Sequence, residues 1–216
     1  MKDGLIKIGF NSEESQRIEP LMKKYINEII LFNSAYYLTN TIDYDELVIR
    51  HIFDSLAPYN LFRTLFENAG NSETFTCGDI GSGGGLPGIP LAAAFPHIKF
   101  CLVERMSKRC AFLENVSAIL GLSNVTIINS EAEKIQKENF DVITFRAFRP
   151  LDEKMTKTLL NITKKNGVLA AYKAKKENII SEMEGIKKLA PNYEIFPLSV
   201  PGLNDSERNL VLIHNN

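Results

Sequence analysis

The chain has 216 residues, with 25 Lys+Arg against 26 Asp+Glu and 44% hydrophobic residues, which is ordinary globular composition. A chain of this length folds without disulfides or a structural metal, and a net charge of −1 excludes a uniformly basic nucleic-acid coat. The longest uncharged run, residues 80–98, has nearly the length of a membrane span, but its five glycines and three prolines exclude a membrane helix.

The N-terminal residues and the cysteines indicate the compartment. Charges at Lys2, Asp3 and Lys7 interrupt the first ten residues, which therefore lack the apolar core of a secretory signal. We expect a cytoplasmic protein. The cysteines are odd in number and lack CxxC or Cys/His ligand spacing, so we interpret them as buried apolar residues and expect no metal site. They are Cys77, Cys101 and Cys110.

Helical patterns dominate the first third of the chain. Asn11 or Ser12, followed by two glutamates, is a helix-start signal, and apolar residues follow at helical spacing. Further helical patterns cover about 45–56 and 61–68. We predict a helical N-terminal leader over residues 1–70, packed on a compact domain of residues 71–216.

Beyond the leader, short β-rich runs alternate with helix-sized segments. These runs are 74–80, 99–104, 125–129, 141–145, 167–173, 193–200 and 209–214. Repeated strand–helix–strand units predict a parallel sheet covered on both faces, with ligands beyond the carboxyl ends of its strands. A loop without a helical pattern joins the last two runs, which predicts an antiparallel pair. The expected fold class is α/β, with a mostly parallel seven-stranded sheet and an antiparallel last strand.

A glycine-rich turn follows the first predicted strand and precedes a helix-like segment. Its sequence is DIGSGGGLPG, residues 79–88. Glycines let a ligand approach the main-chain N–H groups closely, and a purely structural turn would not need five of them. Glu104 ends the second strand, 25 positions after Asp79, where a carboxylate can accept both hydroxyls of a ribose. A nucleoside-containing cofactor is therefore predicted at Asp79, Gly81, Gly83, Gly85 and Glu104.

Three cofactor classes compete for this turn. A nucleoside triphosphate is disfavoured because Gly83 and Gly88 have Walker-loop spacing without the Lys and Ser/Thr that should follow. A nicotinamide dinucleotide stays open, since residues 83–88 satisfy GxGxxG. S-adenosylmethionine fits better, because a carboxylate beside the turn suits a ligand that carries an ammonium group and no phosphate.

The chain resembles the ribosomal RNA small-subunit methyltransferase G family, also called glucose-inhibited division protein B, from about Phe32 to His214. The segments that carry the resemblance are AYYLTN (35–40), LVIRHIFDSL (47–56), DIGSGGGLPGIPLA (79–92), SEAE (130–133), FRAF (145–148), AYKA (171–174) and SERNLVLI (206–213). Four residues depart from the family pattern: Phe32 replaces Trp, Tyr37 alters the usual YNLT, Glu131 replaces a basic residue, and Ala174 replaces Gly.

The resemblance implies a class I S-adenosylmethionine-dependent methyltransferase fold, which is Rossmann-like, and N7 methylation of one guanine in 16S ribosomal RNA. It assigns cofactor contacts to Gly81, Leu86, Ala132, Glu133 and Arg146, with Glu104 facing the ribose. We expect no acid or base catalyst, but positioning by Arg146 and Lys173. The expected partner is 16S ribosomal RNA or the small ribosomal subunit, bound by a monomer.

The residue types at the strand ends indicate which atom of the base is methylated. No cysteine ends the fourth strand to attack a cytosine ring, and no NPPY-like turn follows it to favour an exocyclic amino group. Guanine N7 already presents a lone pair, so its methylation needs positioning more than a base.

Basic residues follow the strands at the predicted ligand edge, and we predict that they contact RNA. They are Arg105, Lys108, Arg109, Arg149, Lys173, Lys175 and Lys176, and we predict that Arg208, directly before the last run, contacts RNA as well. Lys108 and Arg109 lie at a helix N-terminus, which disfavours cations and hints at an anionic partner. For any single lysine, a solvated face with salt bridges is the alternative. In the leader, the spacing of Arg50 and Asp54 predicts a helix salt bridge.

Two further functions stay open at this point. A nicotinamide-dependent oxidoreductase would use the same glycine turn. A ribosome-binding protein could sense the cofactor without catalysis.

Overall fold

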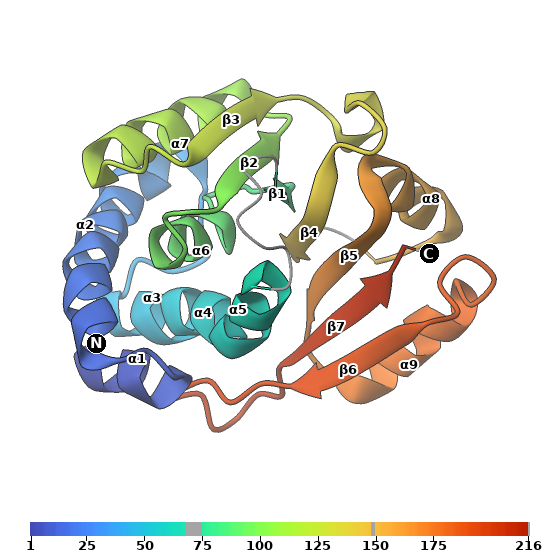
Figure 1. Cartoon of the computed structure of the whole chain (residues 1–216). Helices are drawn as coiled ribbons and strands as arrows, with labels where there is room; N and C mark the ends of the chain where they lie inside the picture. Colours follow the sequence, from blue (N-terminus) through green and yellow to red (C-terminus); the bar gives the residue numbers. More distant parts are fainter. Residues whose placement is uncertain (68–74, 148–149, 216) are drawn as a thin grey trace.

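The computed structural model describes residues 1–67, 75–147 and 150–215, which form one seven-stranded sheet with helices on both faces (Figure 1). The strands are β1 (Thr76–Ile80), β2 (Lys99–Glu104), β3 (Val125–Asn129), β4 (Phe140–Arg146), β5 (Thr163–Lys173), β6 (Tyr193–Pro197) and β7 (Asn209–His214). All seven predicted strands are present, but β6 ends at Pro197 and not at residue 200, and residue 74, where the first run was predicted to begin, lies outside the described residues. The prediction begins β5 at residue 167, whereas the strand begins at Thr163, and a register irregularity between Phe140 and Val142 accommodates the extra residues.

The strand order β3-β2-β1-β4-β5-β7-β6 confirms the α/β class. β1 pairs parallel with β2 and β4, and β4 pairs parallel with β5. β7 runs antiparallel to β5 and β6, as the sequence predicts for the last strand. Because β2 and β3 lie on one side of β1 and β4 and β5 lie on the other, the strand order switches between β1 and β4, and the crevice beyond their carboxyl ends is where such sheets bind ligands.

The leader helices cover one face of the sheet. They are α1 (Lys2–Ile8), α2 (Ser12–Tyr36), α3 (Tyr44–Leu47), the π-helical η1 (Val48–Phe53), α4 (Asp54–Leu56) and α5 (Tyr59–Glu67). Asn11 caps α2 and forms a capping box with Glu14, which confirms the predicted helix start. The predicted boundary at residue 70, and Asn68 of the third helical pattern, lie outside the described residues, so the division into leader and domain stays a prediction.

The other helices belong to the strand connections. They are α6 (Gly88–Ala94), α7 (Ser107–Leu120), the 3₁₀ turn η2 (Ala132–Lys134), α8 (Glu153–Ile162) and α9 (Lys176–Gly185). Side chains of α6 and α7 share a hydrophobic core with the leader, whereas those of α8 and α9 form a second core on the opposite face.

Alternation along the strands explains how one sheet serves two cores. In β5, Ala170 and Tyr172 face the leader, whereas Leu169 and Ala171 face α8 and α9. A continuous apolar strand is therefore expected for a sheet covered on both sides. Cys77 and Cys110 are buried as predicted, and Cys101 is partly buried. Across the described parts of the chain, no helix has both the length and the apolar character needed to cross a bilayer.

Candidate active site at the strand ends

The glycine turn curls over the end of β1. Gly81, Gly83 and Gly85 have φ angles of 72°, 58° and 90°, a region that residues with a Cβ rarely adopt. Gly85 is also enclosed, because a Cβ there would lie 2.6 Å from the Ile89 side chain. The Tyr25 hydroxyl, from the leader, donates a hydrogen bond to the carbonyl of Gly84. The turn is therefore held in shape by both the leader and the helix that follows it.

Glu104, at the end of β2, joins the turn to the next strand. Its Oε2 accepts a hydrogen bond of 2.9 Å from the Gly83 N–H, and its Oε1 accepts one of 2.8 Å from the Met106 N–H. The residue is only 4% exposed. A carboxylate has about four acceptor positions, so two remain for a ligand.

A cavity of about 460 Å³ opens beside Glu104. Its lining includes Ala132 and Glu133 of η2, together with Gly81 and Ala147. Its size and the buried carboxylate of Glu104 fit an adenosine group, whose ribose hydroxyls would donate to that carboxylate. The residues that line this cavity therefore fit the adenosyl part of S-adenosylmethionine.

Asp79 supports the turn from beneath. Its side chain is buried, its Oδ2 accepts a hydrogen bond of 3.0 Å from the Gly88 N–H, and it lines neither cavity. Its Oδ1 has no hydrogen-bond partner within the described residues. Burial raises the pKa of this carboxyl to about 7, against the lowering effect of the Gly88 N–H.

A larger cavity of about 1250 Å³ adjoins the first, and both are lined by Gly81, Arg109 and Ala147. Its walls come from the leader, the glycine turn, the ends of β4 and β5, and α9. The leader contributes residues 38–40 together with Arg50, His51 and Asp54. Segments far apart in the sequence therefore enclose one space.

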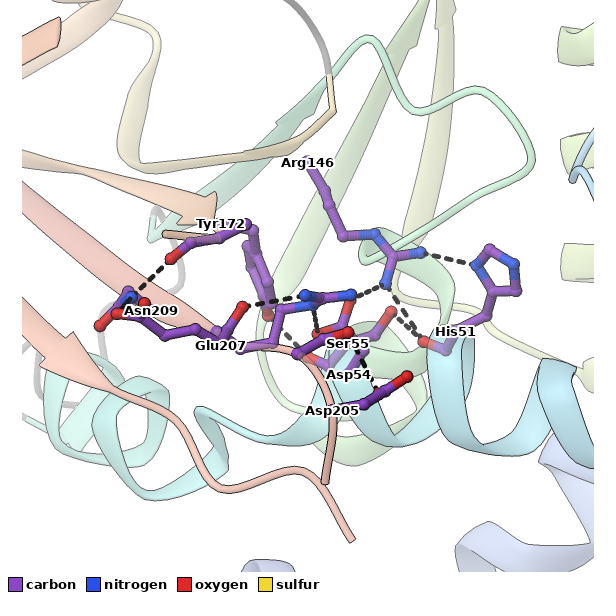
Figure 2. Close-up of polar contacts among 11 residues, drawn as sticks. His51, Asp54, Ser55, Arg146, Tyr172, Asp205, Glu207 and Asn209 are labelled. Atoms are coloured by element: carbon purple, nitrogen blue, oxygen red, sulfur yellow. Dashed lines mark hydrogen bonds and ion pairs between the residues drawn. The ribbon is translucent and has the colours of Figure 1, made fainter. Parts of the chain in front are cut away.

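Asp54 lies at the centre of a charged cluster on the floor of this cavity, which Figure 2 shows. Its Oδ2 accepts a hydrogen bond of 2.8 Å from Arg146, at the end of β4, and its Oδ1 accepts one of 3.1 Å from Arg208, in the loop before β7. The Asp54 side chain is only 7% exposed. One carboxylate therefore connects the leader, the central sheet and the C-terminal loop.

His51 completes the cluster. Arg146 has only donors, so its contact of 3.4 Å with His51 Nδ1 makes that nitrogen an acceptor and leaves the proton on Nε2. Burial, together with the charges of Arg146 and Arg50, lowers the pKa of His51 to about 4. The ring is therefore neutral near pH 7, and its Nε2 has no hydrogen-bond partner within the described residues.

The predicted pair between Arg50 and Asp54 is wrong. Asp54 pairs with Arg146 (Figure 2) and with Arg208. Arg50 instead forms an exposed pair of 3.3 Å with Asp205. Residues four apart on an α-helix can meet, but a buried carboxylate is better stabilised by two partly buried guanidinium groups than by one exposed group.

The predicted RNA-contacting residues fall into two groups. Those that are exposed at the edge of the cavities are Arg105, Lys108, Lys175 and Lys176, with Arg109 partly buried. Lys173 instead pairs with Glu182 of α9 at 2.7 Å, with both side chains 16% exposed, and Arg208 pairs with Asp54. Arg149 lies outside the described residues. Among those described, no group of three or more His, Cys, Asp or Glu side chains could hold a metal ion.

Sequence reasoning missed several residues that the structure brings to the site. Leu38, Thr39 and Asn40 line the larger cavity, and Glu182 holds Lys173 and accepts a hydrogen bond from the Leu151 N–H. A signal existed for the first group, because AYYLTN is one of the segments that carry the family resemblance. The sequence holds no such signal for Glu182, because α9 contains three glutamates and no pattern distinguishes this one from the others.

Comparisons with known proteins agree with this geometry. Residues 18–211 match the GidB family, described as rRNA small subunit methyltransferase G. The chain is 41% identical over 233 residues to the ribosomal RNA small subunit methyltransferase G of Treponema denticola, which covers 97% of the chain and 91% of the relative. It is 35% identical over 208 residues to the protein of the same name from Hydrogenovibrio crunogenus, which covers 95% and 89%.

Solved structures show the same fold at low sequence identity. A SAM-dependent methyltransferase from Aquifex aeolicus superposes with a TM-score of 0.58 at 17% identity, over 81% of this chain and 94% of that one. A tRNA (m1A58) methyltransferase from the same organism superposes with a TM-score of 0.57 at 13% identity, over 88% and 75%. The chain therefore has the fold of the S-adenosylmethionine-dependent methyltransferases, as predicted.

Proposed function

Because this chain belongs to the rRNA small subunit methyltransferase G family, we propose that it transfers a methyl group from S-adenosylmethionine to N7 of one guanine in 16S ribosomal RNA. The observation that carries the proposal is the pair of adjoining cavities at the strand ends. The smaller cavity has the size and polarity for the adenosyl group, and the larger has room for a nucleotide. The family match gives no support to a nicotinamide-dependent oxidoreductase.

The smaller cavity would hold the cofactor. Glu104 would accept hydrogen bonds from the ribose hydroxyls at its two remaining acceptor positions, and Ala132 and Glu133 would lie beside the adenine. Gly81 and Leu86 lie at the larger cavity, where the methionine part would extend toward Arg146. The bound cofactor supplies an electrophilic methyl group on its sulfonium. Asp79, which lines neither cavity, contributes by fixing the turn.

The residues around the larger cavity are suited to positioning rather than to proton transfer. Guanine N7 carries its own lone pair, so the transfer needs alignment and exclusion of water but no base. Cys77, Cys101 and Cys110 line neither cavity, which disfavours a thiolate attack on a pyrimidine ring. Arg146 is a positioning residue, which orients the cofactor carboxylate while Asp54 and His51 fix its guanidinium group.

The charge of the larger cavity suits a cationic reactant. Asp54 offsets one of the two positive charges of Arg146 and Arg208, and Glu182 offsets that of Lys173, which leaves a net charge of +1 on these five side chains. These pairs keep the lining close to electrical neutrality, so a sulfonium beside it meets little repulsion. Lys173 contacts Glu182 of α9, and its ammonium group lies 5.9 Å from the centre of the Phe145 ring of β4. Through these two contacts it positions the end of β5.

The exposed cations at the cavity edge would bind RNA phosphates. Arg105 and Lys108 follow β2, and Lys175 and Lys176 follow β5. They lie at the same edge of the sheet because parallel strands end together, and phosphate contacts by such residues set register and affinity. We propose that the protein acts as a monomer in the cytoplasm, on 16S RNA or on the small ribosomal subunit.

The proposal is tested by methyl transfer from labelled S-adenosylmethionine to small ribosomal subunits purified from cells that lack the enzyme, and in parallel to protein-free 16S RNA. Nuclease digestion and mass spectrometry then identify the product. The expected result is 7-methylguanosine at one position. Binding of S-adenosylhomocysteine with no methylated nucleotide in either RNA would instead favour a cofactor-sensing protein without catalysis, and would overturn the proposal.

Arg146→Ala tests whether Arg146 positions the cofactor. We expect weaker binding of S-adenosylhomocysteine and slower turnover, because the variant loses the group that aligns the cofactor. Arg63→Ala is the matched control, since Arg63 is an exposed residue of α5 that lines neither cavity. If both variants bind cofactor and methylate RNA as the wild type does, Arg146 has no role in the reaction.

A further inference from the structure

Tyr37 is the most exposed of the large hydrophobic side chains in the described residues, with 77% of its surface accessible. It follows the last residue of α2 in the left-handed conformation, at φ 49° and ψ 57°, which disfavours any residue that carries a Cβ. Its neighbour Tyr36 stacks on Phe32 with ring centroids 5.6 Å apart. Within the described part of the chain, the Tyr37 ring makes no such contact. Packing therefore does not explain a tyrosine at this position.

The backbone around Tyr37 is nevertheless rigidly held. Its N–H donates to the carbonyl of Asn33 at 2.9 Å, and its carbonyl accepts a hydrogen bond of 3.0 Å from Arg109. The side chain of Asn33 accepts hydrogen bonds from the N–H groups of Leu38 and Thr39 at 2.9 and 2.8 Å. When this ring binds a partner, only side-chain entropy is lost, because the backbone is already ordered.

Tyr37 also lies at the edge of the candidate active site. The three residues after it, 38–40, line the larger cavity, and Arg109, which contacts its carbonyl, lines both cavities. Lys108, next to Arg109 on α7, is exposed. An exposed aromatic ring next to cations is the combination that binds unpaired RNA, because the ring stacks on a base while the cations contact phosphates.

We propose that Tyr37 is a stacking platform for an unpaired base of the substrate RNA, next to the guanine that enters the larger cavity. This inference rests on the proposed function, since it assigns a contact to the same substrate. The cations at this edge favour RNA over a protein partner, because apolar protein interfaces exclude charge from their centres. Tyr37 is a specificity and affinity residue, and it makes no contact with the reacting atoms.

The first test measures methyl transfer to small subunits from cells that lack the enzyme. Tyr37→Ala should raise the KM for the subunits about tenfold, the loss of one base–aromatic stack, with kcat and the affinity for S-adenosylhomocysteine unchanged. Tyr37→Phe should stay within about twofold of the wild type, because the ring face persists. Leu31→Ala, which removes another exposed apolar side chain (67% exposed) that lines neither cavity, is the matched control.

The second test uses the absence of tryptophan from the sequence. Tyr37→Trp introduces a single indole at the platform, and Leu31→Trp introduces one at the control position. Unmethylated small subunits should quench the fluorescence of Tyr37→Trp and leave that of Leu31→Trp unchanged. A blue shift without quenching would mean that the ring enters an apolar protein surface, and would overturn the inference. An unchanged KM for Tyr37→Ala would also overturn it, whereas a wild-type protein that methylates nothing would refute the proposed function itself.

Discussion

Replacing Asp54 with asparagine removes the one charge that Arg146 and Arg208 share. The carboxylate is 7% exposed, and the two arginine side chains are 13% and 24% exposed. Removing one partner from a buried pair costs about 3–5 kcal/mol, because the remaining charge stays desolvated. Water reaches Arg208 more easily, so we expect the lower end of that range, about 3 kcal/mol. For a chain of this size, the corresponding decrease in Tm is about 6–12 °C.

Asp54→Asn should also weaken cofactor binding, because Arg146 loses the contact that fixes its guanidinium group. Thermal unfolding and titration calorimetry with S-adenosylhomocysteine measure the two effects. Asp205→Asn is the matched control, since it removes a pair in which Asp205 is 69% exposed, and its Tm should equal that of the wild type. If Asp54→Asn unfolds and binds like Asp205→Asn, the buried cluster does not stabilise the site as argued.

Three further variants test other parts of the structure. Because burial raises the pKa of Asp79 from 3.8 to about 7, the folded protein keeps a proton that the unfolded chain releases, and this carboxyl lowers stability as pH rises between those values. We expect the free energy of unfolding of Asp79→Asn, measured with urea, to rise relative to that of the wild type by roughly 4 kcal/mol between pH 4 and pH 7. If the free energies of unfolding of the two proteins change equally with pH, the reasoning is refuted. Gly85→Ala should lower stability by about 3 kcal/mol through strain and overlap, against about 1 kcal/mol for Gly121→Ala, which has a positive φ in open surroundings. Tyr172→Phe removes a buried hydrogen bond of 2.6 Å to a leader carbonyl, so thermal unfolding should show a loss of about 1–2 kcal/mol with cofactor affinity unchanged.

The central strands were predictable because burial on both faces of the sheet makes both sets of alternating side chains apolar, which leaves a short continuous apolar run. The run 167–173 shows this, since its alternate side chains enter different cores. The start of α2 was equally predictable, because Asn11 and Glu14 satisfy each other locally in a capping box. The short helix α1 carries no comparable signal within MKDGLIKIGF, and most of its stabilisation comes from packing on α2 and the rest of the leader.

The sequence alone determined the class of fold and the position of the glycine turn, since both depend on local periodicity and on residues adjacent along the chain. It also determined that Glu104 ends β2, beside the turn. Only the tertiary structure decided the partners of the charged residues. Asp54 meets Arg146, 92 positions away, and Arg208, 154 positions away, and not its helical neighbour Arg50. The physical reason is that desolvation selects among possible ion pairs, and burial is a property of the assembled fold rather than of any spacing in the sequence.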